Sequence, residues 1–502
     1  MDPGKVDGGL ARTGIAGLDD ILVGGLTPNR LYLIEGRPGT GKTTLALDFL
    51  LEGARIGDKG LYVTLSETEY ELRAVAATHG WSLDALELVE LVAEDGLDPE
   101  FEQTLLHPSD VELGETVRGV MERVEALRPE RVVLDSLSEL RLLSQNPLRY
   151  RRQILALKHF FSKLNCTVLM LDDRTADAGD LQLHSIAHGV VTLEQTAIDF
   201  GAERRRLRVM KFRGRKFRGG YHDYRIETGG LRVYPRLVAS EHGVSFAPAP
   251  VSTGVAELDR LLGGGLVPGT TTLLSGPAGV GKTTTTVQCM VAALERGDRA
   301  AYFLFDERMP TLLSRTAALG IDLVRFIEAG RLLIRQVDPA ELSPGEFAGT
   351  VREAVEEFGA GTVLIDSLNG YLQAMPNDKY LTLQMHELLA YLSERGVVTL
   401  MILGQHGTVG DLRTDVDLSY LADTVLLLRY FEADGRVRKS ISVMKTRTTD
   451  HERTIREFRV GPGGVVIGEP LTGFRGVLTG LPEYRADGQT LMESDRERRP
   501  LG

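Results

Sequence analysis

The chain has few cysteines and no long apolar segment. Its 502 residues contain only Cys166 and Cys289, far apart in the sequence. Two isolated thiols exclude a disulfide framework and a cysteine metal cluster, so we expect two small buried side chains. No apolar run reaches the roughly 18 residues that span a bilayer, and none follows the first residues as in a signal peptide. These absences predict a cytoplasmic globular protein.

Positive charge is also in deficit. The chain carries 58 Lys and Arg against 70 Asp and Glu, a formal net charge of −12. An acidic chain has no global attraction to nucleic acid, so binding nucleic acid would require a local basic patch. The run from Arg204 to Arg218, with nine Lys or Arg, is a candidate. The guanine-reading pattern Asn-Lys-x-Asp is absent, which favours ATP over GTP.

The sequence repeats itself at an interval of 240 residues. The segment from Thr13 to Leu26 closely resembles the segment from Thr253 to Leu266, and Lys42 and Lys282 keep the same interval. A length of 502 residues suits two domains. We expect a first domain over 1–245, a second over 246–468, and a partly mobile charged tail over 469–502.

Short β-rich runs alternate with helical patterns in each copy. Apolar runs at Leu31–Ile34, Arg131–Leu134 and Thr362–Ile365 are typical of buried strands, and Thr43 to Leu51 is typical of a helix. The alternation predicts an α/β fold, with a mostly parallel sheet flanked by helices in each domain.

Two phosphate-binding loops occupy equivalent places in the repeat. Gly36–Thr43 and Gly276–Thr283 both match G-x-x-x-x-G-K-T, and each follows an apolar strand and opens a helix. Backbone N–H groups and the helix N-terminus favour phosphate, the lysine reaches the β- and γ-phosphates, and the first threonine ligates Mg²⁺. The predicted nucleotide-binding residues are Gly36, Gly39, Thr40, Gly41, Lys42, Thr43 and Thr44, and Gly276, Gly279, Val280, Gly281, Lys282, Thr283 and Thr284. We therefore expect two Mg·ATP per chain.

Acidic residues follow several of the predicted strands. Asp135 and Asp366 each end an apolar run, where a P-loop protein needs a second metal-binding residue. Glu67 in the first copy, and Asp306 and Glu307 in the second, follow the strand after the P-loop helix. Carboxylates at that sheet edge are candidates for the base that activates water, although they could also be ordinary solvated turn residues.

The tandem P-loops, the Thr-Gly-x-x-x-Leu-Asp lead-in and the paired Asp-Ser-Leu strand ends resemble the KaiC family over about residues 8–480. KaiC proteins are double-domain RecA-type ATPases of the bacterial clock. The resemblance implies two tandem RecA-like P-loop NTPase domains, a homohexamer with ATP between protomers, and serine/threonine autokinase activity in the second domain. It also implies a role in circadian or stress timing and a KaiB-like or other signalling partner.

The resemblance further assigns two trans-acting basic pairs, Lys211 with Arg213 and Lys445 with Arg447. A neighbour's cation of this kind stabilises charge on the transferring phosphoryl group. These residues could instead belong to a solvated face or a nucleic-acid patch.

The chain departs from the family at catalytic positions. Ser419 matches the family's phosphorylated serine, but Tyr420 replaces the adjacent threonine. Ser66 replaces the first glutamate of a Glu-Glu pair, which predicts slow hydrolysis in the first domain unless Glu67 substitutes. Asp306 keeps the charge but is one methylene shorter. A RecA-type DNA-dependent ATPase and an ATP-switched scaffold with little turnover stay open as alternatives.

Overall fold

The computed structural model describes residues 9–91, 108–144, 146–173, 182–197, 201–373, 381–405, 420–479 and 483–484. The chain divides into two compact units, Met1–Arg236 and Leu237–Gly502. The predicted boundaries at 245 and 468 stay predictions.

The first unit is built on a nine-stranded sheet in the order β3-β2-β4-β5-β1-β6-β7-β8-β9. Its first six strands pair in parallel, and β7, β8 and β9 extend it in antiparallel fashion. The strands are β1 Leu31–Gly36, β2 Gly60–Thr64, β3 Leu86–Glu90, β4 Arg131–Asp135, β5 Thr167–Asp172, β6 Gly189–Thr196, β7 Arg204–Phe212, β8 His222–Glu227 and β9 Gly230–Tyr234.

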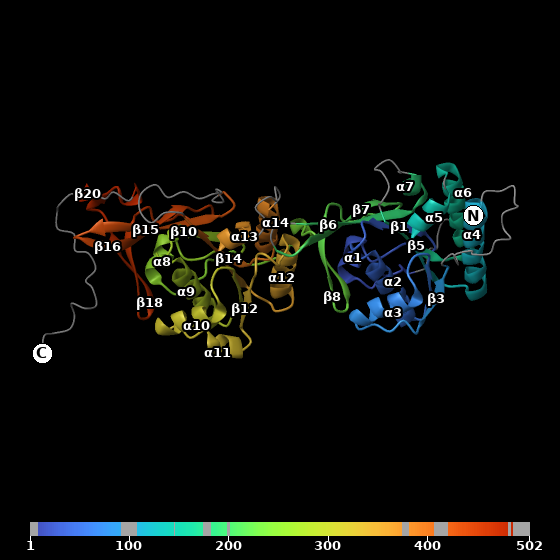
Figure 1. The fold of residues 1–502 in the computed structure, drawn as a ribbon. Helices are drawn as coiled ribbons and strands as arrows, with labels where there is room; N and C mark the ends of the chain where they lie inside the picture. Colours follow the sequence, from blue (N-terminus) through green and yellow to red (C-terminus); the bar gives the residue numbers. More distant parts are fainter. Residues whose placement is uncertain are drawn as a thin grey trace. The chain divides into compact units, whose positions relative to one another are not determined.

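Helices cover both faces of this sheet (Figure 1). One face packs against α1 Ala16–Ile21, α2 Lys42–Ile56 and α3 Glu69–Thr78. The other packs against α4 Pro108–Leu127, α5 Leu137–Ser144, α6 Pro147–Leu164 and α7 Gln182–Ile186. Because both faces are covered, the central strands are continuously apolar, and β1 and β4 are buried along their whole length.

The second unit repeats this plan, with the sheet order β12-β11-β13-β14-β10-β15-β16-β17-β18. Its strands are β10 Thr271–Gly276, β11 Ala300–Leu304, β12 Leu332–Gln336, β13 Thr362–Asp366, β14 Val398–Gly404, β15 Thr424–Ala433, β16 Arg436–Lys445, β17 Arg456–Gly461 and β18 Gly464–Pro470. Its helices are α8 Ala256–Leu261, α9 Lys282–Glu295, α10 Met309–Ala318, α11 Val324–Glu328, α12 Pro344–Glu356, α13 Leu368–Gln373 and α14 Leu381–Glu394. The predicted fold, two tandem RecA-like α/β domains, is confirmed.

Short elements complete both ends of the second unit. They are the 3₁₀ helices η2 Ala239–Glu241 and η3 Val477–Thr479 and the two-residue strands β19 Phe474–Arg475 and β20 Glu483–Tyr484. Leu471 and Val477 are buried with Phe431 and Ala433, so the start of the predicted tail packs on the second unit.

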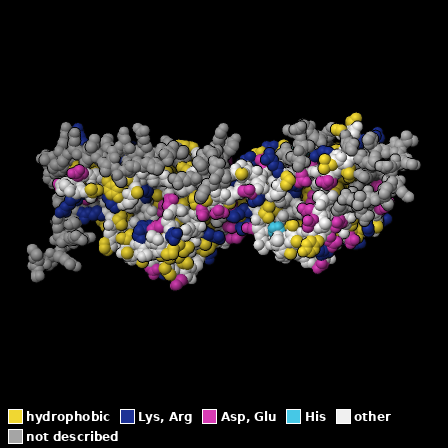
Figure 2. Space-filling view, in the orientation of Figure 1, with side chains coloured by type: hydrophobic (Ala, Val, Ile, Leu, Met, Phe, Trp, Pro, Cys, Tyr) yellow, Lys and Arg dark blue, Asp and Glu magenta, His cyan; other side chains and the backbone are white. Residues whose placement is uncertain are grey.

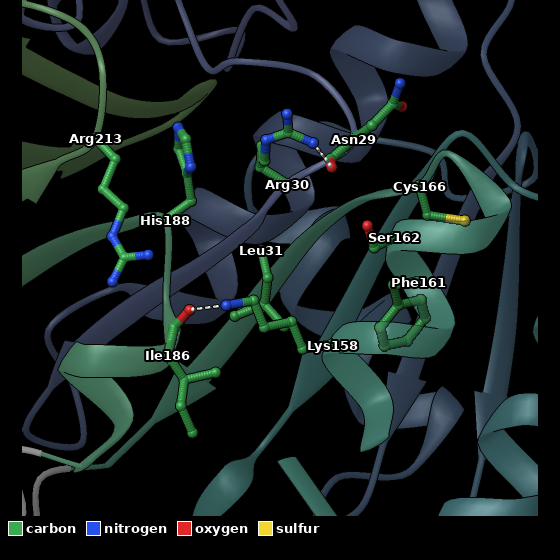
Figure 3. A pocket seen from close by; sticks show the side chains of 10 residues that line it. All are labelled: Asn29, Arg30, Leu31, Lys158, Phe161, Ser162, Cys166, Ile186, His188 and Arg213. Atoms are coloured by element: carbon green, nitrogen blue, oxygen red, sulfur yellow. Dashed lines mark hydrogen bonds between the residues drawn. The ribbon is translucent and has the colours of Figure 1, made fainter. Parts of the chain in front are cut away.

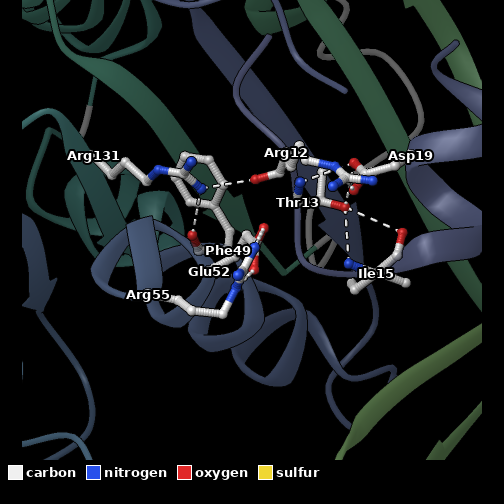
Figure 4. A network of polar contacts seen from close by, with 8 residues as sticks. All are labelled: Arg12, Thr13, Ile15, Asp19, Phe49, Glu52, Arg55 and Arg131. Carbon is white, nitrogen blue, oxygen red and sulfur yellow. Dashed lines mark hydrogen bonds and ion pairs between the residues drawn. The ribbon is translucent and has the colours of Figure 1, made fainter. Parts of the chain in front are cut away.

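The repeated lead-in motif is a hydrogen-bonded bracket (Figure 4). The amide and hydroxyl of Thr13 both donate to Asp19 Oδ1 at 2.8 Å. Thr253 and Asp259 make the same pair of bonds at 2.8 and 2.7 Å. The bracket fixes the segment that precedes each P-loop strand, which explains why both copies carry Thr and Asp at this spacing.

Arg131 fastens the first bracket to the P-loop helix. Its side chain is almost fully buried and donates to the carbonyl oxygens of Arg12 and Phe49, both at 2.7 Å, and to Asp58 at 2.8 Å. A Cβ on Gly53 would lie 2.4 Å from Arg131 Cδ, so only glycine fits there. Arg131 therefore links the bracket directly to α2.

The scarce residue types lie as expected. Cys166 and Cys289 are buried free thiols, and burial raises their pKa to about 11 and about 12. Trp81, the one tryptophan, is partly buried against the core of the first unit, and its ring lies 4.8 Å from that of His79. Among the described residues, no helix has the length and apolar character to cross a membrane.

Candidate functional site

Both P-loops are shaped by glycines in left-handed backbone conformations. Gly41 and Gly281, the last loop residues before α2 and α9, have φ of 87° and 119°. A Cβ at Gly41 would lie 2.7 Å from Ile226, and at Gly281 2.9 Å from Phe458. A side chain at either position would be strained and would clash, so the loop requires glycine there.

The P-loop lysines fold back over their own loops. Lys42 Nζ donates to the carbonyl oxygens of Gly36 and Arg37 at 3.1 and 3.2 Å, and Lys282 Nζ donates to those of Gly276 and Pro277 at 2.8 Å. Both side chains are largely buried. Each ammonium group is buried against two neutral carbonyl groups of its own loop, which favours an incoming anion, so both loops fit phosphate.

The two lysines differ in their charged partners. Lys42 Nζ lies 2.6 Å from Asp173 Oδ1, at the end of β5. Lys282 has no such ion pair among the described residues, and burial lowers its pKa to about 8. The second P-loop therefore holds the less compensated cation.

Each P-loop threonine meets the predicted acidic residue. Thr43 Oγ1 donates to Asp135 Oδ2 at 3.3 Å, and Thr283 Oγ1 donates to Asp366 Oδ2 at 2.9 Å. Burial raises the pKa of both carboxyl groups. A threonine hydroxyl beside a carboxylate is an oxygen donor set that suits Mg²⁺ with nucleotide phosphates completing its coordination.

Two buried tyrosines support these acids, and we did not predict them. Tyr62 OH donates to Asp135 Oδ2 at 2.5 Å, and Tyr302 OH donates to Asp366 Oδ2 at 2.9 Å. The only signal in the sequence is that both tyrosines keep the 240-residue interval. Each hydroxyl fixes the carboxylate that faces the P-loop threonine.

Tyrosines of β8 and β15 also reach the P-loops, and we did not predict them. Tyr224 OH donates to Thr40 O at 2.6 Å, and Tyr430 OH donates to Ala278 O at 3.2 Å. They are separated from their loops by 184 and 152 positions, so no local pattern connects them.

In the first unit the candidate base has an unengaged oxygen. Glu67 Oε2 is buried without a hydrogen-bond partner in the described part of the chain. Burial, followed by the charge of Asp135, raises the pKa of Glu67. Ser136 Oγ is likewise buried with no partner among these residues, and Ser66 supplies no carboxylate.

In the second unit both candidate bases are engaged. Arg315 donates to the two carboxylate oxygens of Glu307 at 3.1 and 2.7 Å. Ser367 donates its hydroxyl to Asp306 Oδ2. Glu307 is thus neutralised by a bidentate guanidinium, and Asp306 is the acid that contacts the strand end of β13.

The basic pairs lie at the ends of equivalent strands. Lys211 pairs with Val190 of β6, and Lys445 with Val425 of β15, one residue after the start of each strand. Lys211 and Arg213 bind backbone carbonyl groups from His184 to Ala187, and Lys445 and Arg447 bind those of Ala422 and Tyr420. Each pair therefore contacts the segment that immediately precedes β6 or β15 in its own unit. The trans-acting role stays a prediction.

The phosphoacceptor candidates are Ser419 and Tyr420. Ser419 lies outside the described residues. Tyr420 is 54% exposed, so its side chain is open to solvent rather than packed in the core.

Comparisons with known proteins match both units. The sequence model of the KaiC ATPase family matches residues 11–238 and 251–472. The circadian clock protein KaiC3 of Synechocystis sp. is 27% identical over 483 residues, which cover 95% of each chain. The circadian clock oscillator proteins KaiC of Acaryochloris marina and Synechococcus elongatus are each 26% identical, over 96% and 94% of this chain and 92% and 91% of their own.

The family match covers nearly the whole chain and both phosphate-binding loops. The relatives match at similar coverage, so the duplication is shared with them. The chain belongs to the KaiC family of ATPases.

Proposed function

We propose that this chain is a hexameric KaiC-type ATPase with serine autokinase activity in its second unit, acting in a cytoplasmic timing system. The observation that carries the proposal is the duplicated constellation of a buried P-loop lysine and a threonine–aspartate pair. Two such sites support the binding of Mg·ATP in each unit.

The residues present fit Mg·ATP. Lys42 and Lys282 would hold the β- and γ-phosphates, and Thr43 with Asp135 and Thr283 with Asp366 would hold Mg²⁺. Bound Mg²⁺ supplies positive charge that stabilises the phosphates during transfer. Tyr62 and Tyr302 keep the aspartates oriented toward that position.

In the first unit we assign the base to Glu67. Its buried oxygen, which has no partner among the described residues, can accept a proton from water. Its raised pKa improves the match to a proton-transfer role near neutral pH. Ser66 cannot take this role, which leaves first-unit hydrolysis dependent on Glu67.

In the second unit we assign the base to Asp306. Arg315 neutralises Glu307, so that carboxylate is a poor proton acceptor. Phosphoryl transfer to a hydroxyl needs a base that contacts the acceptor. We propose Ser419 as the acceptor, with exposed Tyr420 as a second candidate.

Assembly would bring the basic pairs to a neighbour's nucleotide. Arg213 and Arg447 are exposed while their guanidinium groups are steadied by backbone carbonyls of Ser185 and Tyr420. This arrangement supports a role in which each guanidinium group contacts the nucleotide of a neighbouring protomer. The names of the relatives support a circadian role. A KaiB-like partner is what the resemblance to the KaiC family implies.

A DNA-dependent ATPase is less well supported. Several arginines of the basic run are already paired with acids, including Arg206 with Glu194 at 3.0 Å and Arg218 with Asp20 at 2.8 Å. In Figure 2, Lys and Arg are interspersed with Asp and Glu on the visible face of each unit. Nucleic acid is therefore not among the partners we propose.

Peptide mapping of phosphate after incubation with Mg·ATP tests the proposal. We expect phosphate on Ser419 that disappears in Lys282→Ala and persists in Lys42→Ala. Native mass spectrometry should show hexamers at saturating ATP, because a ligand bound across an interface stabilises the assembly. Phosphate release without labelled Ser419 would leave a plain ATPase, and monomers at saturating ATP would contradict the assembly.

A further inference from the structure

A small cavity in the first unit is lined by four basic side chains. It measures about 60 Å³ and lies between β1, α6 and the ends of β6 and β7. Arg30 precedes β1, Lys158 lies on α6, His188 precedes β6, and Arg213 follows β7 (Figure 3). None of the residues that line it is acidic.

The cations of this cavity have only neutral partners. Arg30, Lys158 and Arg213 each donate to a backbone carbonyl, at 3.0, 2.9 and 2.7 Å. No carboxylate among the described residues forms an ion pair with them. The ring atom Nε2 of His188 is buried without a hydrogen-bond partner in the same part of the chain.

Their charges act on one another. Burial lowers the pKa of Lys158, and the charge of Arg213 lowers it further. Burial and the charges of Arg30 and Arg213 lower the pKa of His188. Like charges brought together in a partly desolvated space repel, so an anion bound among them would relieve this repulsion.

The second unit shows what completes such a cluster. His188 and Asp423 occupy equivalent positions, since each immediately precedes the strand that pairs in parallel with the P-loop strand. Asp423 Oδ1 lies 3.6 Å from Arg447, the counterpart of Arg213. Thr270 replaces Arg30. The second unit therefore contains a carboxylate counter-ion, whereas the first has a histidine and one more arginine.

We propose that the first-unit cavity binds a small tetrahedral oxyanion, inorganic phosphate, where the second unit carries the carboxylate of Asp423. Its volume is several times the roughly 10–15 Å³ that one water requires, and it is far smaller than a nucleotide. Guanidinium groups bind phosphate through parallel N–H donors, and a lysine adds a point charge.

Phosphate in this cavity would engage Arg213. This consequence rests on the proposed function, in which Arg213 acts on a neighbour's nucleotide. Phosphate is a product of that hydrolysis, so it would draw the guanidinium inward and slow turnover in the first unit. The site thus provides product inhibition of the first unit. The second unit has no such inhibition, because Asp423 already occupies the place of the phosphate.

Equilibrium dialysis of radiolabelled phosphate tests the site directly. The full chain carries Lys42→Ala and Lys282→Ala and is dialysed without nucleotide, so that neither P-loop lysine binds phosphate and no neighbouring nucleotide engages Arg213. We expect one saturable phosphate per chain, displaced by sulfate. His188→Asp should abolish binding, and Arg30→Gln, at an exposed position, should weaken it at least tenfold.

Lys163→Gln is the matched control, because Lys163 also lies on α6 but does not line the cavity. It should bind phosphate as the parent does. No saturable binding by the parent, or undiminished binding by both His188→Asp and Arg30→Gln, would overturn the site. A thermal unfolding transition shows that each variant folds. If His188→Asp does not fold, Arg30→Gln decides the question.

Dialysis needs no turnover, so the site and the proposed function can fail separately. Phosphate that binds in the cavity and slows first-unit hydrolysis supports both the site and the feedback. Phosphate that binds there without slowing hydrolysis supports the site and overturns the feedback through Arg213.

Discussion

The two P-loop sites have the same phosphate cradle but different surroundings. Each has a buried lysine, a threonine–aspartate pair and a supporting tyrosine. At the sheet edge, Glu67 keeps an oxygen without a partner among the described residues, whereas Arg315 clamps Glu307. The phosphate-binding residues tolerate little change because they must fit the same ligand. The two copies differ instead in the carboxylates at the sheet edge.

Among the variants that test this comparison, Arg213→Ala should have the largest effect. If Arg213 stabilises charge at a neighbour's site, kcat for first-unit hydrolysis should fall about 10³-fold or more. Turnover is measured in a Lys282→Ala background, which isolates the first unit. Arg208→Ala, on the same strand, should change kcat less than twofold. Equal losses in both variants would contradict the trans-acting role.

Glu67→Gln should lower first-unit kcat by about 10²–10³-fold, because it removes the proton acceptor. Burial raises the pKa of Glu67, so this residue becomes protonated at a higher pH than an ordinary glutamate. As the solution is acidified, hydrolysis by the parent should therefore begin to decline at that higher pH. Stopped-flow detection of phosphate release across pH checks both points. Glu69→Gln is the control, and activity retained in Glu67→Gln would assign the base elsewhere.

Lys282→Met should stabilise the nucleotide-free second unit. The pKa of Lys282 is depressed from 10.5 to about 8, so below pH 8 the folded state bears the full cost of a buried charge. As pH rises from about 8 to 10.5 the folded state releases the proton first, and that cost disappears.

The variant should exceed the parent by about 3 kcal/mol in free energy of unfolding at pH 7, and the difference should vanish above pH 10.5. Hydrogen exchange of α9 measures it without nucleotide. Lys282→Arg keeps the charge and should give no gain. A pH-independent difference would show that packing, not charge, is responsible.

The smallest expected effect tests whether the second unit can be made to behave like the first. Arg315→Met releases the Glu307 carboxylate, which should raise second-unit hydrolysis several-fold in a Lys42→Ala background. The double variant Arg315→Met/Glu307→Gln should return hydrolysis to the parent level. No rise in the single variant would show that Glu307 cannot reach water even without its clamp.

Local motifs made much of the site predictable. The P-loops, Asp135 and Asp366 follow from short patterns repeated at a fixed interval, and the alternating apolar runs predict the sheet. Arg315 of α10 contacts Glu307 from eight positions away, and the cationic cavity joins residues 30 and 213, which no short motif links. Such contacts depend on tertiary packing, which neither spacing nor composition encodes.

The position of the one tryptophan gives the molecule a built-in optical label. Trp81 lies in the first unit, partly buried and beside the ring of His79. Fluorescence excited beyond the tyrosine absorption band therefore comes from that unit alone, while circular dichroism reports on both. A denaturant titration followed by the two signals can resolve the melting of each half in the unmodified chain, without dyes or dissection.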